Sequence, residues 1–124
     1  MNGWIGRCLR VNLTEGKHSI EKIEPDLVER FLGGRGLGVK IFMDEVAPQT
    51  DPLAPDNKLI FISGPMVGTG AITGASCNVI TKSSLTGALC QDAGAFWGRT
   101  QIRWVRYGYY RGQSRRTGYP FYNG

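Results

Sequence analysis

Apolar and polar residues alternate at the start of the chain, and this pattern predicts a β-hairpin. Over residues 5–13 apolar side chains alternate with polar or small ones, a period of two that is typical of a strand with one buried face. The segment 14–17, Thr-Glu-Gly-Lys, places glycine where a tight turn needs a left-handed residue. We therefore expect a return strand near residues 18–23.

Two short helices are predicted after the hairpin. Pro25 suits the first helical position, Asp26 lies at the positive end of the helix dipole, and the pair Gly33-Gly34 ends this first helix. The apolar spacing within residues 37–45 predicts a second helix with one face toward the core.

The remaining apolar runs predict further strands. One buried strand is expected at 59–63, a second at 77–81 and a third around 88–91. We expect an α+β fold, a mostly antiparallel sheet with two short helices. Residues 1–98 contain all of these expected elements.

A glycine-rich loop lies between the strands expected at 59–63 and 77–81. Residues 63–74 contain the pairs Gly-Pro, Gly-Thr-Gly and Thr-Gly, which turn the chain sharply or let a ligand approach main-chain N–H groups. Backbone amides in such a loop are suited to hold anions. The loop therefore predicts a binding site made largely of main chain.

Charge and aromatic residues are distributed unevenly along the chain. Residues 1–98 hold nine Lys and Arg against ten Asp and Glu, whereas 99–124 hold six Arg, no acidic residue and all five tyrosines. The basic excess of the whole chain therefore comes from the tail. A basic, aromatic tail is typical of nucleic-acid binding, which is one alternative function.

The three cysteines do not form a metal-binding or disulfide pattern. Cys8, Cys77 and Cys90 lack Cys-x-x-Cys spacing and lie in apolar or strand-like surroundings. We interpret them as small buried hydrophobic residues in a reducing cytoplasm. A charged leader and an apolar run of roughly 20 residues are both missing, so we expect no membrane contact.

Five segments in order resemble one known family. They are GWIGRCLRVNLTEG, FLGGRGLGVKIFMDEV, DPLAPDNKLIFISGPMVGTGA, CNVITKSSLTG and DAGAFWG, and they cover nearly all of residues 1–98. This region resembles the N-terminal domain of tungsten-containing aldehyde ferredoxin oxidoreductases. The resemblance implies that residues 1–98 form an incomplete β-rich base domain on which a bis-pterin tungsten cofactor rests.

The resemblance also implies particular cofactor contacts. It places a Mg²⁺ that bridges the pterin phosphates at Asp92, and a main-chain amide against the pterin at Gly94. Ala93 and Asn78 are further cofactor-binding positions by the same resemblance. Ser76 stands where members often have an arginine that pairs with phosphate, and a neutral hydroxyl there weakens anion binding.

The remaining residues are weaker candidates for a functional site. Lys82 either compensates for the missing arginine or is a solvated lysine at a strand end. The GGRGLG segment lacks the spacing of a dinucleotide fingerprint, so Arg35 lies in a turn between helices and faces the cofactor side at most. His18 is expected at the surface, without catalytic partners. Phe96 and Trp97 either fill the core or cover a cofactor edge.

The resemblance implies an enzyme, an aldehyde ferredoxin oxidoreductase. Such enzymes oxidise an aldehyde to a carboxylic acid at tungsten, or molybdenum in some relatives, and pass electrons through a [4Fe-4S] cluster to ferredoxin. The cluster cysteines and the other catalytic groups of the family lie downstream of the region present, so this chain alone is expected to be inactive. A cytoplasmic location and a possible homodimer of the intact enzyme are also implied. A phosphate-binding or pterin-binding module without chemistry is the other alternative.

The tail, residues 99–124, does not follow the family. Members continue with two strands and a turn, but permitted codons for this tail, read one base later, encode Gly-Leu-Lys-Phe-Ala-Gly-Tyr-Asp and restore the family pattern. Trp104 followed by Val105 must give glycine in that frame. We therefore expect an out-of-frame tail that is poorly ordered or badly packed, and a sheet with an open edge where in-frame strands are missing.

Overall fold

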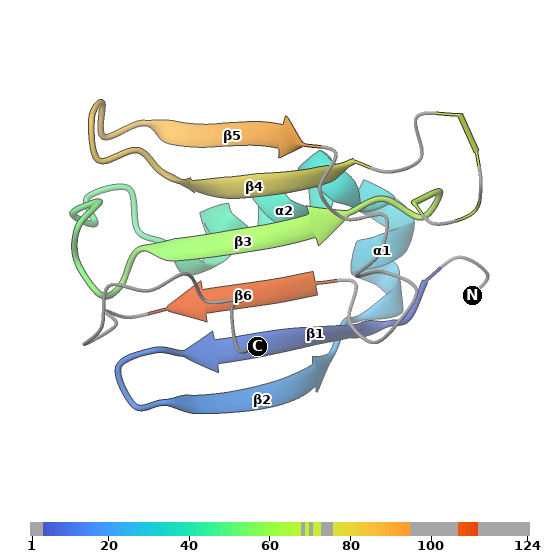
Figure 1. Cartoon of the computed structure of the whole chain (residues 1–124), viewed down its shortest axis with the longest axis horizontal. Coiled ribbons are helices and arrows are strands. Elements are labelled where there is room, and N and C mark those ends of the chain that lie inside the picture. Colours follow the sequence, from blue (N-terminus) through green and yellow to red (C-terminus); the bar gives the residue numbers. More distant parts are fainter. Residues whose placement is uncertain (1–3, 68, 70, 73–75, 95–106, 112–124) are drawn as a thin grey trace, which may run out of the picture.

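The described part of the chain forms one six-stranded sheet with two helices. The computed structural model describes residues 4–67, 69, 71, 72, 76–94 and 107–111, the last five by their backbone alone. The elements are β1 (Arg7–Asn12), β2 (Lys17–Lys22), α1 (Pro25–Phe31), α2 (Gly34–Glu45), β3 (Lys58–Ser63), β4 (Cys77–Lys82), β5 (Leu89–Gly94) and β6 (Tyr107–Arg111). The strand order is β2-β1-β6-β3-β4-β5 (Figure 1).

Most of the strand pairs are antiparallel. The pairs β1–β2, β3–β4, β3–β6 and β4–β5 are antiparallel, and β1–β6 is parallel. The α+β fold expected from the sequence, a mostly antiparallel sheet with two short helices, is confirmed. In the hairpin, the Asn12 Oδ1 accepts hydrogen bonds from the N–H groups of Thr14 and Glu15 at 3.1 and 3.2 Å, and Gly16 takes a φ of +67°.

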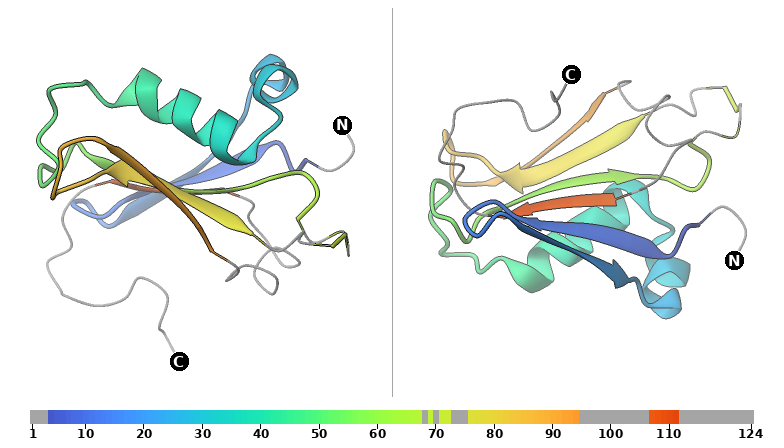
Figure 2. Two further views of the ribbon diagram at one scale, coloured as in Figure 1. Left: turned by 90° about the horizontal axis from the view of Figure 1, so that it is seen from above. Right: turned by 60° about the horizontal axis from the view of Figure 1, so that its bottom comes forward.

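Both helices cover the same face of the sheet, as Figure 2 shows. The α1 helix begins at Pro25 as expected, and its last turn is closed by Leu32, which adopts a left-handed φ of 54°. Gly33 follows with a φ of 108°, so the chain reverses within two residues. As a result α2 begins at Gly34, three residues before the predicted start at 37. In the described part, each helix is too short or too polar to cross a membrane.

The core lies between α2 and the centre of the sheet. Leu37 on α2 and the strand residues Ile60 and Ile80 are 0% exposed. Close approach of helix and sheet depends on Gly38, because a Cβ built there would lie 2.3 Å from Ile80 Cδ1. The rest of the buried cluster comprises Cys8, Val28, Ile41, Phe42, Val46 and Ile62.

The tail contributes a strand, and this differs from the sequence prediction. Tyr107–Arg111 form β6, which pairs with β1 on one side and with β3 on the other. The expected open sheet edge is therefore wrong at this place, because main-chain pairing fills the gap whatever the side chains are. The rest of the tail, 99–106 and 112–124, lies outside the described residues.

Candidate functional site

Strand pairing brings four of the five predicted site residues together. In the β4–β5 register Asn78 lies opposite Ala93, Val79 opposite Asp92, and Cys77 opposite Gly94. Ser76 directly precedes β4 and is exposed. All five predicted positions therefore lie at the end of the sheet where β4 begins and β5 ends (Figure 1).

The pleat of the two strands divides these residues between the faces of the sheet. Asn78 lies on the side of the helices, since it shares the parity of the buried Ile80. Asp92 lies opposite Val79, so its side chain points to the other face. The predicted site residues therefore lie on both faces of the sheet and do not form one cluster of side chains.

On the helix side, Asn78 lies beside the start of α2. A Cβ built on Gly34 would be 3.5 Å from Asn78 Nδ2 and 3.8 Å from the main-chain N of Gly64. Gly34 has a left-handed φ of 54°, and the N-cap residue Gly33 supplies no side-chain hydrogen bond. Three glycines thus bring main chain close together around one amide side chain.

Sequence reasoning missed Gly34 and Gly64 as parts of this site. The signal was present, since glycine occurs at both positions and the pair Gly33-Gly34 was expected to end the first helix. What was absent from the sequence was the distance between them, because 30 positions separate two residues that become neighbours. The glycine loop itself is described only in part, at 64–67, 69, 71 and 72.

Asp92 on β5 presents an exposed carboxylate. Its Oδ1 accepts a hydrogen bond from the N–H of Ala93 at 2.7 Å. Among the described residues no three His, Cys, Asp or Glu side chains gather around a possible metal position. Asp92 by itself provides too few ligands for a Mg²⁺ site made of protein alone. It is suited to a Mg²⁺ that is also bound by ligand phosphates, since the ion is often held by one or two carboxylates together with phosphates.

Lys82 does not compensate for the missing arginine at Ser76. Its ammonium group donates hydrogen bonds to the carbonyl oxygens of Pro48 and, at 2.8 Å, of Thr50. These contacts hold the loop after α2, at the opposite end of β4 from Ser76. The compensating role is therefore wrong, while the position at a strand end is confirmed, with a half-buried side chain that binds main chain of its own domain.

The cysteines differ in exposure. Cys8 and Cys77 are buried, and burial raises the pKa of both thiols, that of Cys77 to about 11. Both are inert small core residues at neutral pH, as expected. Cys90 is exposed, so the prediction of burial is wrong there, because Cys90 lies on β5 at the edge of the sheet.

The remaining predicted positions are either at the surface or not described. His18 on β2 and Arg35 on α2 are both exposed, which agrees with a surface position for His18. The turn expected at Arg35 is wrong, because α2 already begins at Gly34. Phe96 and Trp97 lie outside the described residues.

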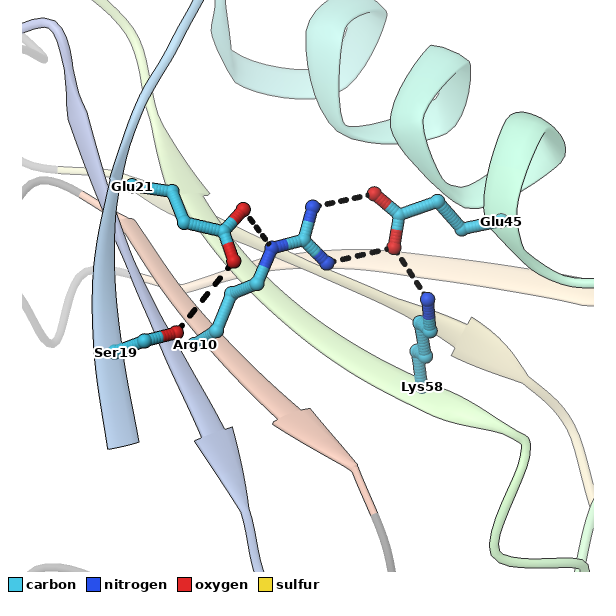
Figure 3. Close-up of polar contacts among 5 residues, drawn as sticks. All are labelled: Arg10, Ser19, Glu21, Glu45 and Lys58. Atoms are coloured by element: carbon cyan, nitrogen blue, oxygen red, sulfur yellow. Dashed lines mark hydrogen bonds and ion pairs between the residues drawn. The ribbon is translucent and has the colours of Figure 1, made fainter. Parts of the chain in front are cut away.

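The strongest electrostatic feature lies away from this site and joins α2 to the sheet (Figure 3). Arg10 Nη1 and Nη2 donate to the two carboxylate oxygens of Glu45 at 2.8 and 2.7 Å. Lys58 donates to the same carboxylate. These bonds hold the pKa of Glu45 well below its usual range, at about 2, with Arg10 as the main cause.

The same arginine also contacts β2. Arg10 Nε donates to Glu21 Oε2 at 2.5 Å. The four charges are therefore paired within the domain, and this cluster has a structural rather than a chemical role.

Comparison with known proteins identifies the family. The model of the N-terminal domain of aldehyde ferredoxin oxidoreductase matches residues 8–108. The tungsten-containing aldehyde ferredoxin oxidoreductases of Pyrococcus furiosus and Thermococcus kodakarensis are each 43% identical over 99 residues, 79% of this chain and 16% of those proteins. The chain thus spans about one sixth of the curated relatives it matches.

More distant relatives have other names. A P. furiosus protein named aliphatic sulfonate oxidoreductase, WOR-like subunit, is 34% identical over 86 residues, 67% of this chain and 14% of that protein. Among solved structures, the active site complex BamBC of benzoyl coenzyme A reductase, in complex with 1,5 dienoyl-CoA, superposes with a TM-score of 0.86 at 30% identity. This match covers 92% of this chain and 18% of that chain. From the sequence match over most of its length and from the shared fold, the chain belongs to the aldehyde ferredoxin oxidoreductase family.

Proposed function

We propose that this chain is part of an oxidoreductase that oxidises aldehydes to carboxylic acids at a tungsten, or molybdenum, bis-pterin. Electrons would then pass through a [4Fe-4S] cluster to ferredoxin. The observation that carries the proposal is the 43% identity over 99 residues to proteins named tungsten-containing aldehyde ferredoxin oxidoreductases. A bound tungsten pterin supplies a metal that takes up the two electrons released when an aldehyde becomes a carboxylate.

The role of this chain in that enzyme is to hold the anionic end of the pterin. The donors that fit are the Ser76 hydroxyl, the Asn78 amide and the main-chain amide of Gly94, which lie at one end of the sheet. The N–H of Ala93 already donates to Asp92, so it can reach the anion only when the carboxylate turns away. Asp92 would hold the bridging Mg²⁺.

The chain alone does not provide the electron-transfer part. A [4Fe-4S] cluster is commonly held by four cysteine thiolates, whereas the whole chain has three cysteines. Two of these are buried in separate strands, β1 and β4. We infer that catalysis needs residues of the parent enzyme beyond those present.

Anaerobic expression tests this function. The gene with its downstream coding region in frame would be expressed with tungstate, and the product assayed for tungsten and for aldehyde-dependent reduction of a viologen dye. We expect bound tungsten and dye reduction for that product, and neither for the 124-residue chain. A folded full-length product without tungsten or aldehyde oxidation would contradict the proposal.

The cofactor-holding role has a separate test in this chain. Calorimetric titration with Mg²⁺ and pyrophosphate measures anion binding at the β4–β5 end without any redox readout. Asp92→Asn should weaken the Mg²⁺-dependent part of binding, while Asp56→Asn, at an exposed loop position, should not. Equal effects of the two variants would argue against Asp92 as the metal ligand.

A further inference from the structure

The face of the sheet that points away from the helices is apolar. Its residues alternate along the strands with the core residues Ile60, Ile62 and Ile80, so they point to the opposite side. Both helices lie on the core side (Figure 2). We call the apolar residues of the second side the open face; they are Leu9 and Val11 on β1, Ile20 on β2, Leu59 and Phe61 on β3, and Val79 on β4.

The open face is continuous across the sheet. In the strand register Leu9 and Phe61 lie on either side of Gly108. Phe61 in turn lies opposite Val79, and Leu9 lies opposite Ile20. The row therefore crosses five of the six strands, from β2 to β4.

The chain leaves the open face partly uncovered. Ile20 is 62% exposed, and the other open-face residues are half-buried. At the end where β4 begins, by contrast, Cys77 and Ser63 on the same side of the sheet are 3% and 1% exposed. An antiparallel sheet with one side in water normally carries polar residues on that side. The open face is therefore better suited to contact with protein than to contact with water.

The outer side of the two helices has the opposite character. Its exposed residues are mostly charged and include Asp26, Glu29, Arg30, Arg35 and Asp44. Charged side chains are favourable in water and are depleted at the core of protein interfaces. Of the two sides of the domain, the sheet side is the one suited to bind a partner.

The size of the relatives indicates which polypeptide covers the open face. The matching family model is that of an N-terminal domain, and the chain spans 16% of the P. furiosus enzyme. In such a protein most of the polypeptide follows this domain in the same chain. A segment of the same chain has a much higher effective concentration at the open face than a separate molecule has. This favours the downstream polypeptide over a second copy as the occupant.

We propose that the open face is the surface on which the downstream part of the parent enzyme packs, through an apolar surface of its own. The inference rests on the proposed function only in that the chain is part of a larger enzyme. Packing there excludes water from the second side of the sheet, as strands with apolar residues on both sides require.

Thiol alkylation at the open face tests this proposal. Val11→Cys and Val79→Cys, each combined with Cys90→Ser to remove the exposed native thiol, are introduced into the 124-residue chain and into the folded product of the gene with its downstream region in frame. Peptide mass spectrometry measures the alkylation rate at each position. We expect alkylation in the chain and a rate at least about tenfold lower in the longer product, because a covered thiol reacts only when its surroundings open.

The control is Ser84→Cys, in the exposed turn at the end of the β4–β5 hairpin, which should react at similar rates in both proteins. Unchanged rates at the two valine positions, or equal slowing at Ser84→Cys, would overturn the proposal. Slow alkylation already in the 124-residue chain would also overturn it, since the chain or a second copy would then cover the face. The measurement needs neither tungsten nor aldehyde oxidation, so its failure is distinct from failure of the proposed function.

Discussion

Glu45 is the residue on which three elements meet. It ends α2, and its carboxylate accepts hydrogen bonds from Arg10 on β1 and Lys58 on β3. Its side chain is 24% exposed, so the pairing is partly shielded from water. In such surroundings removal of one partner leaves the other charges without compensation, and this costs more than the pair itself contributes.

Glu45→Gln should destabilise the domain by about 2 kcal/mol, since charge-assisted bonds are lost. The pKa of Glu45 is lowered in the folded state to about 2 from an ordinary 4.5. Its stabilising contribution is therefore present above pH 4.5 and is lost as the pH falls toward 2. Denaturant unfolding at several pH values measures this, and the variant should lose less stability on acidification than the parent.

The matched control is Asp44→Asn on the same helix. Asp44 pairs with Lys40 at 2.5 Å, but both side chains are more than a third exposed. Such surface pairs contribute at most about 1 kcal/mol. If the two variants were equally destabilised, Glu45 would have no special role in joining the elements.

Under the proposed function, the side chain at position 76 should set how strongly the β4–β5 end binds anions. Ser76→Arg should increase the affinity for Mg²⁺ with pyrophosphate about tenfold, because a guanidinium makes two charge-assisted contacts with a phosphate. Isothermal titration calorimetry of the chain measures the change. Ser84→Arg, in the exposed turn at the other end of the same hairpin, adds the same charge elsewhere. Equal gains from both substitutions would show a general charge effect only.

At the scale of elements, glycines decide how closely α2 packs on the sheet. Gly38 faces Ile80 and Ile62, and a Cβ built on Gly38 would lie 2.8 Å from Ile62 Cγ2. Gly33 is in contact with the Trp4 ring, where a built Cβ would lie 1.9 Å from Cη2. Glycine therefore allows both the helix turn and the helix–sheet contact.

Gly38→Ala should destabilise the domain by about 1–3 kcal/mol, because the added methyl group overpacks a filled core despite the better helix propensity of alanine. Thermal or denaturant unfolding measures the loss. Met43→Ala is the comparison, since Met43 on the same helix is 61% exposed and should change stability by less than about 1 kcal/mol. A stabilised Gly38→Ala variant would show that the helix can move away from the sheet.

Hydrogen exchange at β6 distinguishes the strand seen in the structure from the poorly ordered tail that the sequence predicts. The amides of 107–111 that pair with β1 or β3 should exchange with solvent as slowly as those of β3, because they are in the centre of the sheet. Hydrogen exchange with mass spectrometry measures this. Exchange as fast as in the turn at 84–88 would favour the poorly ordered tail expected from composition.

At the scale of the whole molecule, the helices cover one face of the sheet in the described part of the chain (Figure 2). On the other face of the strands lie apolar residues such as Leu9, Phe61 and Val79, all half-buried. The chain spans 16% of its aldehyde ferredoxin oxidoreductase relatives. A domain with so small a core should have low stability by itself.

The origin of the tail is a prediction about the gene. If residues 99–124 are out of frame, their codons read in another frame should restore the two strands and turn of the family. Nucleotide sequencing through codons 90–130 tests this, and codons that fail to restore the pattern would end the hypothesis. The outcome also shows which residues the family would place between β1 and β3, where β6 lies here.

Local patterns predicted most of the fold, and distant contacts account for what they missed. The period of two predicted β1, the turn at 14–17 predicted β2, and the apolar spacing predicted α2, because all three signals are properties of neighbouring residues. The five site positions came from the family resemblance, and strand pairing brings them to one end of the sheet. Lys82 was misjudged because its carbonyl partners, Pro48 and Thr50, are more than 30 positions away.

The amino-acid sequence by itself therefore determined the helices, most of the strands and the family, since these depend on local periodicity and on ordered motifs. Only the tertiary structure decided the place of Tyr107–Arg111 in the centre of the sheet. It also decided the meeting of Arg10, Glu45 and Lys58. Main-chain pairing and long-range ion pairs join residues that are far apart in the chain. No pattern in the intervening sequence indicates that these residues meet.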